Sequence, residues 1–230
     1  MDRGHALIYE ETLRVPTDAF SYDGFQDWLV SGEFPESGRI DFLAGDVEVD
    51  MTAEELHTHG TVKGAILAVL HYLIADTDLG EVFVDSARVQ SRLAQLSVEP
   101  DVVVVLWESL DAGRVRYVSM STKREDRFSV MEGAPDLVVE VVSDSSVGKD
   151  TRRLPALYAR AGVPEFWLVD VRGEEPRFEI RTLREDEYAA VDADAEGWFR
   201  SPRLGLAFRL ARRRTQRGHW RYVLEHTAST

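Results

Sequence analysis

The chain has 230 residues, 44% of them hydrophobic, which is enough to bury the core of one domain with small extensions. It has no cysteine, and this excludes disulfides, thiolate metal sites and cysteine nucleophiles. The formal net charge of -14 argues against broad affinity for nucleic acid, although acids gathered at a metal site add to that charge. No apolar run could span a membrane and no signal-peptide segment opens the chain, so we expect a soluble cytoplasmic protein with no membrane partner.

The first half of the chain predicts a mixture of strands and one long helix. Residues 1–37 mix polar and aromatic residues and read as an N-terminal extension. Two alternating runs around Ala44-Gly45-Asp46 predict a hairpin. Apolar residues at helical spacing predict a helix over 54–75. Three strands are expected after it, over about 81–85, 87–93 and 101–106. A polar loop or hairpin is expected over 108–127.

The second half contains the most informative stretch, a strand, a polar loop, a helix and a second strand between Pro135 and Asp170. A Gly162-Val-Pro164 sequence predicts the end of the helix over 150–161. We expect the following strand to lie inside the sheet beside the strand of Glu140, with Trp167 buried. The whole predicts one α/β domain, with a core over 38–175 and further strands and a basic tail over 176–230.

Two acids in apolar strands are the main functional lead. Glu140 interrupts the run Leu-Val-Val-Glu-Val-Val, and Asp101 opens the run Val-Val-Val-Val-Leu after Pro100. A carboxylate buried in such a strand needs a partner or a metal ion. Magnesium prefers oxygen ligands and keeps several waters, so these two acids and the backbone carbonyl of Val141 would suffice. The alternative makes Asp101 a strand-entry residue and Glu140 the partner of a buried arginine.

Other site classes find little support in the sequence. His57 and His59 stand two residues apart, no H-E-x-x-H pattern exists, and we expect capping or surface roles for the histidines. The chain also lacks the G-x-S-x-G sequence of serine hydrolases and the glycine-rich loops that bind nucleotides. Neither zinc chemistry, nor serine hydrolysis, nor nucleotide binding is therefore expected.

Residues 211–222 form the one dense basic run in an acidic chain. The run contains Trp220 and five arginines, which are Arg212, Arg213, Arg214, Arg217 and Arg221. It could grip phosphates while the tryptophan stacks on a base. Runs of this kind are more often a solvated edge or a segment that docks on an acidic face of the same protein.

The stretch PDLVVEVVS, followed by DTRRLPALYARAGVPEFWLVD, resembles the Uma-two family of bacterial restriction-endonuclease-like proteins, a branch of the PD-(D/E)XK nuclease superfamily. The resemblance extends back through EPDVVVV, the helix opening at His59 and the IDFLAGD hairpin. It implies a restriction-endonuclease-like fold, which is a mixed central sheet flanked by helices. It also implies that Asp101 and Glu140 occupy the metal-binding positions and that Asp46 is a helper acid.

The chain departs from the family at the catalytic lysine. The superfamily motif places this lysine two residues after the second acid, where Val142 stands. The family commonly moves it to the helix, midway between Asp150 and Tyr158, where Leu154 stands. Three nearby cations could substitute for it, namely Lys149, Arg152 and Arg153. Arg153 lies about 100° around a helix from position 154, so equivalence is not assured.

The function expected from these residues and the resemblance is a magnesium-dependent endonuclease that hydrolyses DNA, with manganese as a substitute ion. Asp101, Glu140 and the Val141 carbonyl would hold the metal, and Lys149, Arg152 or Arg153 would supply the catalytic cation. The alternative is a catalytically inactive nuclease-fold protein that binds a protein or nucleic-acid partner, which the missing lysine and the acidic charge favour. Whether the chain forms a homodimer is left open.

Overall fold

The computed structural model describes residues 13–35, 38–52, 55–119, 128 and 130–228. Its centre is a six-stranded sheet in the order β12-β11-β10-β9-β6-β3. Strands β9 and β10 pair in parallel and the other neighbours are antiparallel, so the sheet is mixed. The strands are β3 (Gly80–Val84), β6 (Val102–Leu106), β9 (Leu137–Val141), β10 (Glu165–Asp170), β11 (Arg177–Arg184) and β12 (Glu187–Ala190).

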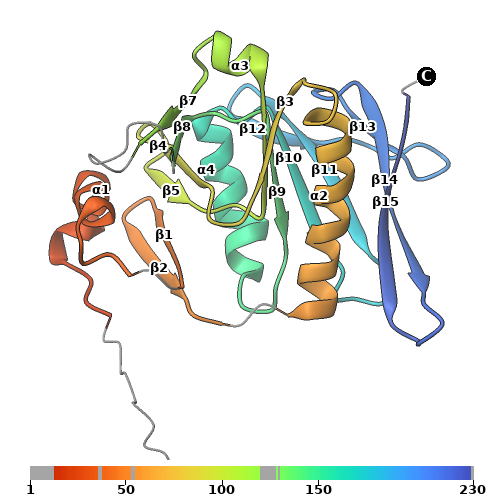
Figure 1. Cartoon of the computed structure of the whole chain (residues 1–230), viewed down its shortest axis with the longest axis horizontal. Helices are drawn as coiled ribbons and strands as arrows, with labels where there is room; N and C mark the ends of the chain where they lie inside the picture. Colours follow the sequence, from red (N-terminus) through yellow and green to blue (C-terminus); the bar gives the residue numbers. More distant parts are fainter. Residues whose placement is uncertain (1–12, 36–37, 53–54, 120–127, 129, 229–230) are drawn as a thin grey trace, which may run out of the picture.

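Two helices cover opposite faces of this sheet (Figure 1). Helix α2 (Thr61–Ile74) buries its apolar side against Val139 and Trp167, whereas α4 (Leu154–Ala161) buries its own against Val138 and Phe166. Successive residues of a strand point to opposite faces, which explains how one apolar strand serves both helices. The predicted fold, a mixed central sheet flanked by helices, is confirmed.

A second six-stranded sheet, in the order β2-β1-β5-β4-β8-β7, lies beside the central one and carries the N-terminal hairpin. Its strands are β1 (Arg39–Leu43), β2 (Asp46–Asp50), β4 (Arg88–Ser91), β5 (Leu96–Val98), β7 (Val115–Val118) and β8 (Val130–Gly133). The 3-10 turn η1 (Thr17–Phe20) and helix α1 (Tyr22–Val30) pack an aromatic cluster against β1. The short helix α3 (Trp107–Asp111) and β7 occupy the first part of the segment expected as a loop or hairpin, and β7 pairs antiparallel with β8. Residues 120–127 lie outside the described residues.

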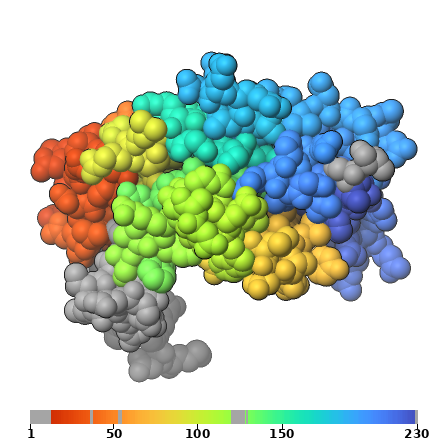
Figure 2. Space-filling view, turned by 90° about the horizontal axis from the view of Figure 1, so that it is seen from above, coloured from red at the N-terminus to blue at the C-terminus, as the bar shows by residue number. Residues whose placement is uncertain are grey.

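A three-stranded sheet closes the molecule on the far side of α2. It consists of β13 (Phe199–Ser201), β14 (Leu206–Arg214) and β15 (Trp220–Ala228). Phe208, Tyr222 and Leu224 join the same apolar cluster as the α2 residues, so α2 is packed on both sides. The N-terminal helix and these C-terminal strands lie at opposite ends of the molecule (Figure 2).

The helix after β9 begins earlier than the sequence indicates. A π-helical turn, η3 (Lys149–Arg153), precedes α4. Gly162 ends α4 in the left-handed conformation, with a φ of 85°, which a glycine adopts without steric cost. Trp167 in β10 is fully buried and β10 pairs with β9, as predicted. No helix among the described residues is long and apolar enough to cross a membrane.

Candidate metal centre

Asp101 and Glu140 lie together at the end of two adjacent strands. Strands β6 and β9 pair with Val102 opposite Val139, and one further step in this antiparallel register sets Asp101 opposite Glu140. Directly opposed residues of an antiparallel pair place their side chains on the same face. Both side chains are buried, with residue exposures of 1% for Asp101 and 2% for Glu140. Two acids have therefore been removed from water side by side.

Asp101 is held as a carboxylate by three donors. Its Oδ2 accepts a 2.7 Å hydrogen bond from the Val141 N–H and lies 3.3 Å from Nε2 of His59, while its Oδ1 accepts from Nη2 of Arg39 at 3.4 Å. Burial alone would raise the pKa of Asp101. The His59 hydrogen bond, the Arg39 charge and the Val141 N–H outweigh burial and lower that pKa to about 2.

Glu140 has the opposite electrostatic environment. Its Oε1 accepts a 2.6 Å hydrogen bond from the Tyr158 hydroxyl. Burial, followed by the negative charges of Asp101 and Asp150, raises the pKa of Glu140 well above its usual value, and the Arg39 charge and the Tyr158 hydrogen bond offset only part of this. The pair is thus one carboxylate that ionises readily beside one that needs an additional positive charge to do so.

A second ionic contact lies next to this pair. Asp41 of β1 is 2% exposed, and its Oδ1 accepts a 3.2 Å hydrogen bond from the Glu99 N–H. Its Oδ2 lies 3.1 Å from Nζ of Lys149, whose side chain is 10% exposed. Burial lowers the pKa of Lys149, but the negative charges of Asp41, Glu140 and Asp150 together outweigh burial and the Arg39 charge, so the net shift is upward. The turn η3 after β9 therefore holds a charged ammonium group beside Asp41.

Asp150 is the fourth buried acid of the region. It is 2% exposed and accepts a short hydrogen bond from the Ser146 hydroxyl. Burial raises its pKa to about 6, against the opposing effects of Ser146 and the Lys149 charge, and the Asp101 charge adds to the rise. The π-helical turn η3 thus positions Lys149 and Asp150 together beside the strand ends.

Two neighbouring hollows open onto part of this cluster. One has a volume of about 710 Å³ and is lined by Arg39, His59 and Asp101 among others. The other has a volume of about 1020 Å³ and is lined by Arg39, Asp41 and Lys149 among others. Because Arg39 lines both hollows, we treat them as one cleft, and we call it the acid cleft. A ligand in the acid cleft would meet the Asp101 carboxylate and the Lys149 ammonium group.

The structure separates the candidate cations. Arg152 is exposed on the wall of the acid cleft. Arg153 forms ion pairs with Asp46, at 2.9 Å, and with Glu48. The Asp46 side chain is 73% exposed, so this hairpin acid lies outside the buried cluster. Of the three cations, Lys149 is the one held within the cluster.

The two positions that lack the expected lysine are both apolar in this fold. Val142 and Leu154 are each 1% exposed and belong to the apolar cluster beneath α4. No charged group replaces the family lysine at either position. Of the three cations considered as substitutes, Lys149 is the one that reaches the cluster, through Asp41.

Sequence reasoning missed four residues of the cluster. Asp41 carries the same signal as Glu140, an acid inside an apolar strand, and could have been found in Ile40-Asp41-Phe42-Leu43. Arg39 had no signal beyond its place in the same hairpin. His59 was expected in a capping or surface role, but it is 9% exposed and faces Asp101, which corrects that expectation. Tyr158 was noted only as part of a family motif.

The donor set is compatible with magnesium. Among the described residues no group of three or more His, Asp or Glu side chains could hold a metal ion. Magnesium, however, needs only one or two carboxylates because it retains several waters. The raised pKa of Glu140, caused by burial and by Asp101, marks a place where a cation would relieve repulsion between two buried acids. Residues Asp101 and Glu140, with the Val141 carbonyl, fit such an ion.

The mixed α/β fold, with two buried acids at the ends of adjacent strands, agrees with the restriction-endonuclease-like fold that the sequence resemblance implies. A solved structure described as a "putative nuclease belonging to DUF820", from Anabaena variabilis, shares the fold: the TM-score is 0.59 at 15% sequence identity, over 80% of this chain and 90% of that one. Residues 22–213 match the model of the Uma2 family, described as "Putative restriction endonuclease". The chain belongs to the Uma2 family, as its sequence predicts. No curated protein sequence matches it significantly.

Proposed function

We propose that this protein is a magnesium-dependent phosphodiesterase that cleaves DNA. The observation that carries the proposal is the burial of Asp101 and Glu140 opposite each other, with the Lys149 ammonium group held beside them by Asp41. Such an arrangement is costly for folding, because each buried charge loses its hydration. A cluster that serves catalysis accounts for this cost, since perturbed buried acids in a cleft are typical of functional sites.

Asp101, Glu140 and the Val141 carbonyl would hold magnesium, or manganese in its place. When bound, such an ion lowers the pKa of a water ligand and neutralises negative charge on a phosphate. His59 and Arg39 fix the orientation of the Asp101 carboxylate, and Tyr158 fixes that of Glu140. These contacts hold the two oxygen ligands in place before any substrate arrives, which reduces the reorganisation needed during the reaction.

Lys149 is the cation that we assign to the reaction. Its Nζ would stabilise the charge that develops on the phosphate oxygens or orient the attacking water. Asp41 keeps this ammonium group charged and restricts its position. Arg152 and Arg153 are less suitable, because the first is exposed and the second is paired with Asp46 and Glu48. In the same way, Asp41 takes the helper role that the family resemblance assigns to Asp46.

One observation favours a second function, that of a catalytically inactive nuclease-fold protein which binds a partner. Both oxygens of Asp101 already have donors, since Oδ1 faces Arg39 and Oδ2 faces His59 and Val141. In that case Arg39 would act as a permanent counter-charge and no metal would be needed. The two functions differ in whether the Asp101–Glu140 pair takes up a divalent ion.

A metal titration and a cleavage assay on one preparation distinguish the two functions. Isothermal titration calorimetry with Mn²⁺ should show one site in the wild type and none in Asp101→Asn. Supercoiled, linear and single-stranded DNA should then be incubated with Mg²⁺, with Mn²⁺ and with EDTA. We expect cleavage of at least one form by the wild type with either ion, and none by Asp101→Asn. A folded wild type that neither binds Mn²⁺ nor cleaves any form would establish the inactive alternative.

A further inference from the structure

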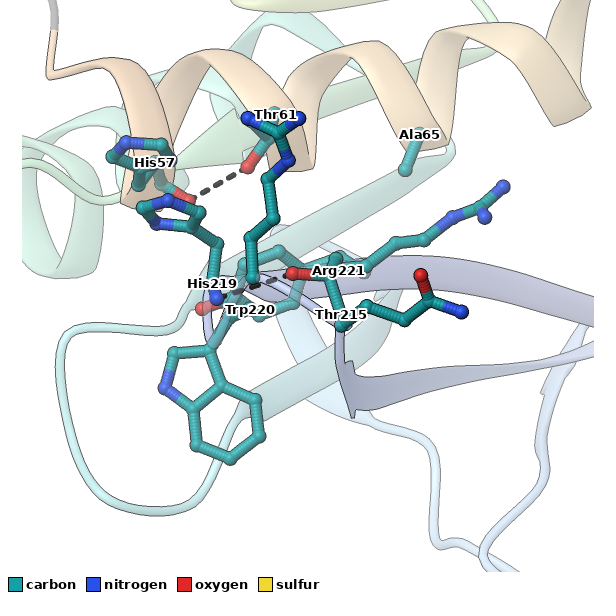
Figure 3. Close-up of a pocket in the computed structure, with 10 residues that line it drawn as sticks. His57, Thr61, Ala65, Thr215, His219, Trp220 and Arg221 are labelled. Carbon is teal, nitrogen blue, oxygen red and sulfur yellow. Dashed lines mark hydrogen bonds between the residues drawn. The ribbon is translucent and has the colours of Figure 1, made fainter.

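A separate groove lies between the tip of the β14–β15 hairpin and the start of α2 (Figure 3). Its volume is about 700 Å³. The hairpin side contributes polar, basic and aromatic side chains, and the helix side contributes His57, Thr61 and Ala65. Gly218, at the hairpin tip, has a φ of 84°, which explains why a glycine stands in this turn. We call this the hairpin groove.

The two sides of the hairpin groove are joined by a pair of histidines. The rings of His57 and His219 stack with their centroids 4.9 Å apart and an interplanar angle of 6° (Figure 3). The Thr61 hydroxyl donates a 2.6 Å hydrogen bond to the His57 carbonyl, and the Thr215 hydroxyl accepts one of 3.1 Å from the His219 N–H. Both histidines are exposed, so their ring N–H groups remain at the surface.

The basic run has no acidic residue of its own, and only some of its arginines are engaged within the protein. Arg212 and Arg214 lie over the Trp220 ring, 3.9 Å and 3.8 Å from its centroid, and Arg213 pairs with Glu225 at 2.9 Å. Two guanidinium groups therefore lie against the Trp220 ring, where a base would have to stack. The remaining two arginines determine what the groove can bind.

Arg217 and Arg221 are the free cations of the hairpin groove. Both are exposed and both line the groove. Within the part of the chain that the structure describes, neither has an ion pair or a hydrogen bond from its side chain. In a protein with a net charge of -14, two unpaired arginines beside exposed imidazole N–H groups form a local positive surface. Their natural complement is a ligand with closely spaced negative charges.

The hairpin groove is adjacent to the acid cleft. The π-helical turn η2 (Leu56–Gly60) separates them, and it lines both: His57 faces the groove, whereas Thr58 and His59 face the cleft. His59 in turn contacts Asp101. A chain-like anion that lies in the groove would therefore need to cross only one turn of helix to reach the Asp101–Glu140 pair.

We propose that the hairpin groove binds the phosphodiester backbone of DNA on the flank of the scissile site, with Arg217 and Arg221 each contacting a phosphate. The path of the DNA from the groove to the acid cleft rests on the proposed function. Binding of DNA in the groove does not depend on it. Guanidinium groups suit phosphate oxygens because they present several donors in one plane. Gln216 and His219 supply further donors at the same surface, so contact with the backbone requires no particular base sequence.

The test measures DNA binding in EDTA, where no metal-dependent reaction occurs. Fluorescence anisotropy with a labelled DNA duplex at several salt concentrations would compare the wild type with the double variant Arg217→Ala/Arg221→Ala. The matched control is Arg184→Ala/Arg200→Ala, which also removes two exposed arginines but lies outside the groove. Asp101→Asn is measured alongside, so that loss of cleavage and loss of binding are separated.

The groove variant should raise the Kd for DNA at least about 10-fold and make the slope of log K against log salt shallower by about 1.8, the contribution of two phosphates of duplex DNA. The control should change the Kd less than about 3-fold, and Asp101→Asn should bind at least as tightly as the wild type. Unchanged Kd and slope in the groove variant, with the fold intact by circular dichroism, would overturn the proposal. Equal competition by polyglutamate of the same total charge would overturn the assignment to nucleic acid.

Discussion

The acid cleft and the hairpin groove use charge in opposite ways. In the cleft, acids and bases alternate at short distances and most are buried; Lys149 faces Asp41, and Arg39 faces Asp101. In the groove, the free charges are all positive and exposed, and Arg217 and Arg221 have no acidic partner among the described residues. Buried pairs fix the positions of reactive groups, whereas exposed cations attract a polyanion without fixing it.

This difference indicates that the acid cleft serves the reaction and the hairpin groove serves binding. The cleft residues lie mostly in or next to strands and in the turn η3, and most of them are buried. The groove residues belong to a hairpin tip, where side chains can adapt to a flexible ligand. We therefore expect substitutions in the cleft to change reaction rate or stability, and substitutions in the groove to change binding and its dependence on salt.

Replacing Trp167 tests whether the central sheet and the sheet of the hairpin share one core. Its ring contacts Phe178 and Phe208, with centroids 5.4 Å and 4.8 Å away, so it joins the central sheet to the sheet of the hairpin. Trp167→Ala should lower the free energy of unfolding by about 3–5 kcal/mol, because a large buried ring leaves a cavity. Urea unfolding measures the loss, with the partly exposed Trp107→Ala as the control; equal stability of both variants and the wild type would contradict a shared core.

Lys149 distinguishes a catalytic cleft from a merely buried ion cluster. Lys149→Met should lower the rate of DNA cleavage by about 10²–10³, the effect of losing one preorganised charge-stabilising donor, while Mn²⁺ binding stays unchanged. Arg152→Met, three residues along the same segment, should change the rate less than about 3-fold, because Arg152 is exposed. Equal losses in the two variants would show that overall positive charge, and not the position of Lys149, supports the reaction.

Asp150 allows the electrostatics of the cleft to be tested without any substrate. Its pKa is raised from the usual 3.8 to about 6, so the group contributes stability below pH 4 that is lost as the pH rises to 6. Asp150→Asn should therefore gain about 2 kcal/mol in unfolding free energy relative to the wild type between pH 4 and pH 7. Urea unfolding in EDTA at both pH values measures this gain, and parallel pH profiles for the two proteins would contradict the assigned environment.

Asp46 should give the smallest effect. It was a candidate from the family resemblance, but its side chain is 73% exposed and pairs with Arg153 at the surface. Asp46→Ala should cost less than about 1 kcal/mol of stability and leave cleavage within about 2-fold of the wild type. A large loss of cleavage would show that Asp46 takes part in the reaction and would contradict the assignment of the helper role to Asp41. Asp41→Asn is the variant to compare with it.

Much of the fold could be predicted from the sequence, because short local patterns of residues specify its strands and helix ends. Apolar runs predicted the strands of Asp101, Glu140 and Trp167, and the glycine–proline sequence after α4 predicted its end. The pairing of β6 with β9 is a contact between distant segments, and nothing in either strand alone specifies it. The division of the chain into a core over 38–175 and two extensions stays a prediction; strands β11 and β12 continue the central sheet beyond residue 175.

The composition of the site was less accessible, because it depends on contacts between distant segments. Asp41 and Lys149 meet through the packing of β1 against the loop after β9, and no spacing in the sequence encodes that contact. His59 reaches Asp101 because the turn η2 brings the start of α2 to the strand end. The histidine pair at the hairpin groove is of the same kind, since His57 and His219 come from segments far apart in the chain.

The central claim is that Asp101 and Glu140 share one divalent ion, and a crystal soaked in MnCl₂ tests it most directly. Anomalous scattering at the manganese edge identifies the ion without ambiguity. We expect one anomalous peak between the two carboxylates, with oxygen–metal distances of about 2.1 Å and Arg39 displaced from Oδ1 of Asp101. If the Arg39–Asp101 contact is retained and no manganese peak appears at a saturating concentration of MnCl₂, the claim is contradicted.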